Sequence, residues 1–275
     1  MGFKPHASFR PPSSAGVKLW RYMDFTKFFS LIRTGKLYFP SAWQLREQDP
    51  FEGSLNAFHA KYQGVGVVGG GQDKTWFAER DVAPEGWGEK EWKFTNKIMT
   101  EARREIRKYT YINSWHMSEH ESFAMWKLYD RSSNGLAVVT NFEKLCASLV
   151  YGKPIYVGCV EYIDYQSDAA WLGNLFDPFM RKTMALRHES EVRAVVCDHR
   201  EGFSDFMNSL MLKRDRQLLD PPLGVSVECN LDELIDYVVV SPTAPGWVVD
   251  LVKDYCREAI GKQVSSSSLK EEPFF

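Results

Sequence analysis

The sequence has few of the features that mark several common classes of protein. Its 275 residues contain five cysteines, at positions 146, 159, 197, 229 and 256, and none of them form a C-x-x-C pair. An odd, scattered set of this kind indicates reduced thiols, not a disulfide or zinc framework. No apolar run approaches the roughly 18 residues that span a bilayer, and residues 1–16 lack the apolar segment of a signal peptide. We therefore expect a soluble, cytoplasmic protein with no membrane partner.

Neither the net charge nor the common sequence motifs indicate a binding partner. With 34 Lys and Arg against 36 Asp and Glu, the formal net charge is −2, so only a local patch could attract nucleic acid. Neither G-x-S-x-G nor Walker A occurs, which argues against a serine hydrolase and ATP-driven work. Gly64, Gly66 and Gly69 match G-x-G-x-x-G, but no convincing strand precedes them and no helix starts within the motif. We therefore interpret residues 64–71 as a flexible loop.

The hydrophobic content of 44% is enough for a sizeable core. VKLWRYM predicts a strand, DFTKFFSLIRTG a helix with Asp24 as N-cap and Gly35 past its end, and KLYFP a second strand. Later segments predict helices over 90–108 and over LFDPFMRKTMAL, strands at KYTYINSWH, GLAVVTN and ESEVRAVVC, and a closing helix at GWVVDLVKDYCREAIG. The irregular alternation predicts an α+β fold, with a mixed, largely antiparallel sheet flanked by helices.

Composition also predicts how the chain is organised. Residues 1–16 are rich in Pro, Ser and Gly, and residues 263–275 contain SSSSLKEEPFF. Such segments bury little apolar surface. We expect a flexible N-terminal segment at 1–16, a single α+β domain at 17–262 and a disordered tail at 263–275.

The segment INSWHMSEHESFAMWKLY is the first candidate site. On a strand, Ser114 and His116 point to one face and Trp115 to the other. His116 and His120 are four residues apart, but a turn separates them, so they are a poor metal pair and we expect no metal. From Phe123 onward the apolar residues have helical spacing and predict a core helix.

The segment RHESEVRAVV is the second candidate. If the strand begins by Glu189, the carboxylates of Glu189 and Glu191 share one face with Arg193. Neighbouring like charges raise at least one pKa, a cost that a cation relieves or that acid-base or electrostatic chemistry uses. Arg193 is either that structural counterion or a group that binds substrate.

Two further candidates lie at strand ends, where sheets often present ligands. Asp49 and Glu52 form an acidic turn after the strand KLYFP. Arg21, followed by the aromatic Tyr22, stands at the end of the first strand. Its guanidinium could grip a phosphate or carboxylate, or merely pair with Glu52.

Taken together, four blocks resemble a bacterial and phage family of unknown function, family 2971, over roughly residues 17–200. The blocks are LWRYMDFTKFFSLIRTGKLYFP, DPFEG, SWHMSEHESFAMWKLY followed by GLAVVTNF, and HESEVRAVV. That family has no settled activity. The resemblance therefore implies a general outline of the protein but no reaction mechanism.

A looser resemblance, to the ADP-ribosyltransferase superfamily, concerns the chemistry. An early strand with a basic or aromatic residue, a middle strand with Ser and an aromatic, and a late strand opening with E-x-E occur in that order. The resemblance implies an ADP-ribosyltransferase-like fold with NAD as co-substrate. Here the middle strand reads Ser-Trp-His where the superfamily often has Ser-Thr-Ser.

The same resemblance implies roles for particular residues. Glu191 would be catalytic and Glu189 would orient the acceptor. Arg21 would contact the dinucleotide, and the nicotinamide-ribose pocket would be built from Ser114 and its aromatic neighbours. These neighbours are Tyr22, Trp115 and His116, and the candidate substrate-binding residues are Asp49, Glu52 and Arg193.

Three functions follow as hypotheses. The first is an NAD-consuming transferase or glycohydrolase that belongs to a toxin or phage-defence system and whose acceptor is protein, nucleic acid or water. The second is a non-enzymatic sensor that binds a ligand or protein. The third is a metal-dependent nuclease that uses His116, His120, Glu121 and late carboxylates. The sequence does not set the oligomeric state.

Overall fold

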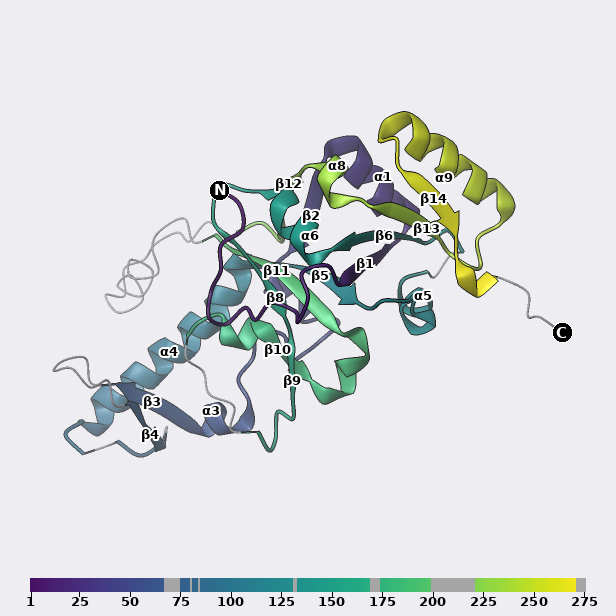
Figure 1. Cartoon of the computed structure of the whole chain (residues 1–275). Helices are drawn as coiled ribbons and strands as arrows, with labels where there is room; N and C mark the ends of the chain where they lie inside the picture. Colours follow the sequence, from purple (N-terminus) through teal and green to yellow (C-terminus); the bar gives the residue numbers. More distant parts are fainter. Residues whose placement is uncertain are drawn as a thin grey trace.

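A seven-stranded sheet forms the centre of the structure, in the order β14-β13-β6-β1-β5-β11-β8 (Figure 1). The computed structural model describes residues 1–66, 75–79, 81–83, 85–130, 133–168, 174–198 and 221–270. All neighbouring strands in this sheet are antiparallel except the β13–β14 pair. The predicted mixed, largely antiparallel sheet is therefore confirmed. Its strands are β1 Lys18–Met23, β5 Thr110–Met117, β6 Leu136–Asn141, β8 Ile155–Cys159, β11 Glu191–Cys197, β13 Tyr237–Val240 and β14 Gln263–Ser266.

The described residues also form three smaller sheets. They are β2 Lys36–Pro40 with β12 Gly224–Cys229 and β7 Leu149–Val150, the parallel pair β9 Glu161–Ile163 and β10 Arg181–Thr183, and the hairpin β3 Tyr62–Gly66 and β4 Thr75–Glu79. Gly64 and Gly66 therefore lie in a paired strand, which corrects the loop expected at 64–71. The rest of that loop, residues 67–71, lies outside the described residues.

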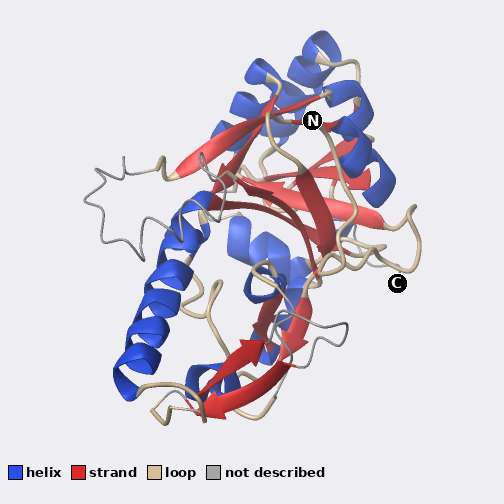
Figure 2. Cartoon of the chain, turned by 90° about the vertical axis from the view of Figure 1, so that its left-hand side faces the viewer, coloured by secondary structure: helices blue, strands red, loops and turns tan. Residues whose placement is uncertain are grey.

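Helices cover both faces of the sheet (Figure 2). On one face lies the main hydrophobic core, where helix residues such as Phe28 and Val252 pack with Leu19, Val138 and Val192 of the strands. The helices of this face are α1 Phe25–Thr34, α6 Phe142–Ser148, α8 Leu231–Leu234 and α9 Gly246–Ala259.

The opposite face has two separate apolar clusters. One joins Ile112 and Val195 of the sheet to residues of α2, of α4 and of a short 3-10 helix, η1. The other joins Trp20 and Tyr22 to Trp126 of α5. The elements concerned are α2 Ala42–Leu45, α4 Glu89–Tyr109, α5 Phe123–Tyr129 and η1 Asp177–Met180. The remaining elements are α3 Ala57–Lys61, η2 Met184–Glu189 and η3 Ser268–Lys270.

The β1-α1-β2 start has the predicted capping. The side chain of Asp24 accepts a hydrogen bond from the backbone N of Lys27 at 2.9 Å, which satisfies a free N–H of the first turn. Gly35 ends the helix in the left-handed region at φ 63°, where glycine has no steric penalty. Local sequence chemistry therefore determines both ends of α1.

The helix predicted over LFDPFMRKTMAL is wrong. That stretch folds instead as η1, β10 and the 3-10 helix η2. Pro178 lies in the first turn of η1, where its missing N–H is tolerated. The chain then extends because β10 pairs in parallel with β9. A tertiary partner thus overrides the helical spacing.

Both ends of the chain are more ordered than composition predicts. Phe9 is buried, and its ring lies within 5.7 Å of those of His6, Tyr156 and Phe176, so it fixes the N-terminal segment on β8 and η1. At the other end, Gln263–Ser266 form β14, and residues 271–275 lie outside the described part. These findings correct the flexible segment expected at 1–16 and, for residues 263–270 alone, the expected disordered tail. None of the helices in the described ranges is long and apolar enough to cross a membrane.

Candidate functional site

A polar strip interrupts the apolar face between the two clusters. It consists of Ser114 and His116 on β5 and Glu191 and Arg193 on β11. In the antiparallel register Glu191 lies opposite His116 and Arg193 lies opposite Ser114. Alternation along the strands therefore places all four side chains on one face.

Arg193 is the centre of this strip and is 1% exposed. Its Nε donates to Glu191 Oε1 at 2.7 Å, and its two terminal nitrogens each donate to a carboxylate oxygen of Glu52 at 2.7 Å. It also donates to Glu191 Oε2 at 3.3 Å and to the carbonyl of Phe179. All five N–H groups of the guanidinium are thus used. Arg193 is thus the counterion of Glu52 and Glu191, and its substrate-binding role stays a prediction.

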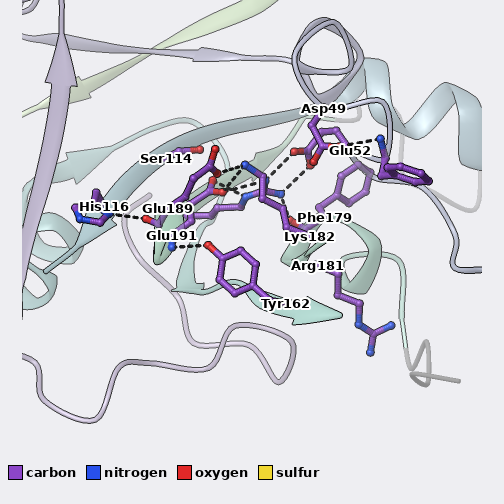
Figure 3. A network of polar contacts seen from close by, with 12 residues as sticks. Asp49, Glu52, Ser114, His116, Tyr162, Phe179, Arg181, Lys182, Glu189 and Glu191 are labelled. Atoms are coloured by element: carbon purple, nitrogen blue, oxygen red, sulfur yellow. Dashed lines mark hydrogen bonds and ion pairs between the residues drawn. The ribbon is translucent and has the colours of Figure 1, made fainter. Parts of the chain in front are cut away.

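Lys182 of β10 adds a second buried cation (Figure 3). Its Nζ lies 2.9 Å from Glu191 Oε2 and 2.5 Å from Glu189 Oε2. Tyr162 contributes as well, because its hydroxyl oxygen accepts the backbone N–H of Glu191 at 2.8 Å. Sequence reasoning missed both residues, since each depends on the pairing of β9 with β10, which no local motif signals.

Glu189 reaches the site by a different route from the one predicted. The strand begins at Glu191, and Ser190 before it has φ 39° in the left-handed region. Strand alternation therefore does not place the two carboxylates on one face, but Lys182 brings them together. The Glu189 side chain is 18% exposed and that of Glu191 only 3%. Glu189 is the more accessible carboxylate.

The two carboxylates that share Arg193 have opposite pKa shifts. Burial alone would raise the pKa of Glu191, but the charges of Arg193 and Lys182, with hydrogen bonds that include one from Ser114, lower it to about 2. Burial raises the pKa of Glu52 by more than Arg193 lowers it, and the charge of Glu191 raises it further. Glu191 is therefore a fixed anion at neutral pH.

Arg21 lies where two central strands separate. The ladder between β1 and β5 has two residue pairs, the last of them Trp20 with His116. Immediately beyond it, a terminal nitrogen of Arg21 donates to the Ser114 carbonyl at 2.5 Å. Burial lowers the pKa of Arg21 to about 10 against the charges of Tyr129 and Glu191, which raise it. Arg21 makes no ion pair within the described part of the chain, so it does not pair with Glu52.

Tyr129 is a further residue that sequence reasoning did not select. It lies at the end of α5 and is 44% exposed. Burial of its hydroxyl raises its pKa, and the charges of Glu189 and Glu191 raise it further, whereas Arg21 lowers it. Tyr129 therefore adjoins both the anionic and the cationic part of the site.

Several predicted pocket residues are buried in the interior. Trp115 is 1% exposed and packs in the main core, where its indole N–H donates to Asn113 at 2.8 Å. The Tyr22 hydroxyl accepts the backbone N–H of Ser122, and its ring meets Trp126 edge-on. Both rings are packed against other side chains, and their role as stacking surfaces for nicotinamide stays a prediction.

The acidic turn after β2 is also structural. Glu52 is 1% exposed and faces Arg193, and Asp49 accepts the backbone N–H of Phe51 at 2.9 Å. These contacts stabilise the turn, and the substrate-binding role of both residues stays a prediction.

His116 has one ring nitrogen engaged. Because its Nδ1 lies 2.6 Å from the carbonyl oxygen of Glu189, Nδ1 donates and Nε2 is the acceptor of the neutral ring. Burial lowers the pKa of His116, so the ring is neutral at pH 7. Among the described residues there is no group of three or more His, Cys, Asp or Glu side chains that could hold a metal ion.

Comparison of the chain with protein-family models, with curated proteins and with solved structures finds no match. The class of the protein is therefore defined here by its fold and site alone: a mixed α/β protein with a buried ionic network on its central sheet.

Proposed function

We propose that the protein is an NAD-consuming enzyme of ADP-ribosyltransferase-like fold, either a transferase or a glycohydrolase. The observation that carries the proposal is the convergence of Arg21, Ser114 and Glu191. Arg21 donates to the Ser114 carbonyl, and the Ser114 side chain hydrogen-bonds Glu191. These residues come from three different strands. The Arg21 guanidinium could bind a dinucleotide phosphate, and the Glu191 carboxylate could stabilise a cation at the ribose.

The charges suit cleavage of the bond between nicotinamide and ribose. Three carboxylates, of Glu52, Glu189 and Glu191, surround two cations, Arg193 and Lys182. Arg21 is a third cation beside these groups. A dinucleotide phosphate bound to Arg21 would neutralise its charge, so the three carboxylates would outnumber the two remaining cations and the site would carry a net negative charge. The oxocarbenium-like cation formed at the ribose is stabilised by such fixed negative charge.

The group transfer then assigns a separate role to each carboxylate. The carbon–nitrogen bond breaks and nicotinamide leaves with the bonding electron pair, while Glu191 stabilises the cation. An acceptor hydroxyl, of water or of a second substrate, forms the new bond to the ribose carbon and loses its proton. Glu189 is the more exposed carboxylate and would orient this acceptor and take the proton.

Nicotinamide release from NAD tests the proposal. The full chain is incubated with NAD, and free nicotinamide is measured for wild type, Glu191→Gln, Glu189→Gln and the control Arg257→Gln. Arg257 lies on α9, where it forms an exposed pair with Asp254 outside the network. Loss of one preorganised electrostatic contact costs about a hundredfold in rate, so both Glu variants should fall to that extent and the control should not. No release by wild type, or equal rates for wild type and Glu191→Gln, would refute the proposal.

A binding module without turnover is the second candidate. The observation that favours it is the saturation of Arg193 and the 3% exposure of Glu191, since a purely structural network has these properties. Calorimetry with NAD separates the two: binding without nicotinamide release indicates a sensor, whereas binding with release supports the enzyme. The nuclease hypothesis receives no support from the arrangement of His116, whose Nδ1 is engaged by a backbone carbonyl.

A further inference from the structure

A cluster of cations joins α2 to the C-terminal end of α4. The last seven residues of α4 include Arg103, Arg104, Arg107 and Lys108 and only one acidic residue, Glu105. Arg46, just after α2, adds to this group. This local excess contrasts with the net charge of −2 for the whole chain.

Trp43 of α2 is the point at which the cations meet. The guanidinium carbon of Arg46 lies 3.5 Å from the centre of the Trp43 ring, and the Arg46 terminal nitrogen donates to the Trp43 carbonyl at 2.7 Å. Lys108 Nζ lies 5.7 Å from the same ring. Stacking on an aromatic fixes the plane of a guanidinium, so Arg46 is preorganised to bind an anion.

Three of these arginines have no acidic partner among the described residues. Arg46, Arg104 and Arg107 form no ion pair within the part of the chain that the structure describes, whereas Lys108 pairs with Glu105 at 2.8 Å. Arg107 donates to the Gly53 carbonyl at 3.4 Å. Burial lowers the pKa of Arg107, and the charges of Arg46 and Arg104 lower it further, against the charge of Glu52.

Unpaired like charges held together destabilise a folded protein, and an external anion relieves that repulsion. The cations are distributed over two elements: Arg104 and Lys108 are one helical turn apart on α4, and Arg46 extends the row onto Trp43. A row of separate cations suits the repeated phosphates of a strand better than one isolated phosphate. Cations interleaved with an aromatic ring are typical of surfaces that bind single-stranded nucleic acid.

We infer that Trp43, Arg46, Arg104, Arg107 and Lys108 form a docking surface for the phosphodiester backbone of single-stranded nucleic acid. This surface lies outside the carboxylate network, and the inference goes beyond the proposed NAD chemistry and does not depend on it. The turn between Glu52 and Gly53 connects the two places, because Glu52 binds Arg193 and the Gly53 carbonyl accepts from Arg107.

Fluorescence anisotropy with a labelled single-stranded oligonucleotide of about 20 nucleotides tests the inference. Each phosphate contact with a single strand contributes about 0.7 to the slope of log affinity against log salt. The double variant Arg46→Gln/Arg104→Gln should bind at least about tenfold more weakly at low salt, with a slope smaller by about 1.4. The matched control Arg33→Gln/Lys253→Gln removes the same charge from exposed positions on α1 and α9 and should bind like wild type.

The following results would overturn the inference. Absence of binding by wild type overturns it, and so does an equal loss in the variant and the control, which would show unspecific attraction. Competition by inorganic pyrophosphate or polyglutamate as strong as that by unlabelled oligonucleotide would also overturn it, because the surface would then select a small phosphate or any polyanion. Thermal melts by circular dichroism check that both double variants are folded, and the altered residues are partly or fully exposed.

Discussion

The substitution Arg193→Met tests the importance of the buried network. Arg193 is 1% exposed and gives all five of its N–H groups to Glu52, Glu191 and the Phe179 carbonyl. Methionine fills much of the volume but leaves two buried carboxylates without this cation. Removal of one partner from a buried ion pair costs roughly 3–5 kcal/mol. We expect a loss of that size, which lowers the melting temperature on the order of 10 °C.

Chemical denaturation and thermal melts at pH 7 measure this loss. The control is Arg257→Met, which removes a cation that is 72% exposed and paired with the 61% exposed Asp254, and should cost less than about 1 kcal/mol. The double variant Glu52→Gln/Arg193→Met also removes one of the two carboxylate charges that have lost their cation. It should therefore be more stable than Arg193→Met alone. A cost for Arg193→Met below about 1 kcal/mol, or no recovery in the double variant, would refute the reasoning.

The pH dependence of Arg193→Met gives a further check. In the wild type the folded pKa of Glu191 is about 2, below its ordinary value of 4.5, so its contribution is present above pH 4.5 and is lost as the pH falls toward 2. Without Arg193 the folded pKa of Glu191 rises, so protonation relieves the buried charge. The stability difference between wild type and variant should therefore shrink as the pH falls from 7 to 4.

Three other predictions concern stability. Glu191→Gln should flatten the dependence of unfolding free energy on pH between about 4.5 and 2, as denaturation series in that window would show; an unchanged slope contradicts the assigned shift. Gly158→Ala places a Cβ 2.7 Å from the backbone of Phe9, so it should cost about 1–3 kcal/mol and expose the N-terminal segment to limited proteolysis. Asp24→Ala removes the cap on the Lys27 N–H and should cost about 1 kcal/mol in urea unfolding, and no loss would argue against the cap.

The parts of the fold that local chemistry controls could be predicted from the sequence. Asp24 and Gly35 determine the ends of α1, and the apolar strand patterns predicted most strands of the central sheet. The helix expected over residues 175–186 failed because β10 pairs with β9, and this competes with local helical spacing. The Pro-rich composition of residues 1–16 likewise predicted a flexible segment, but the packing of Phe9 against its aromatic partners fixes this segment on the domain.

The site was predicted less completely than the fold. Strand alternation correctly placed Ser114 with His116 on one face of β5, and Glu191 with Arg193 on one face of β11. The pairing of β5 with β11, which brings these two pairs together, was not predicted. The partner of Arg193 lies 141 residues away, at Glu52, and no spacing rule connects such positions. Lys182 was not selected for the same reason, although it contacts both Glu189 and Glu191. Charge complementarity identifies candidate residues, but only the folded chain shows which candidates pair with one another and lose access to solvent.

Nicotinamide release from NAD is the most direct test of the central claim. We expect the full chain to release nicotinamide, and Glu189→Gln and Glu191→Gln to reduce the rate about a hundredfold. Arg21→Gln should raise KM for NAD because it removes a phosphate contact. Glu189 is the decisive variant, since its side chain is 18% exposed and its replacement leaves the Arg193 pairs intact. A folded Glu189→Gln protein that releases nicotinamide as fast as the wild type, or a wild type that releases none, would contradict the account.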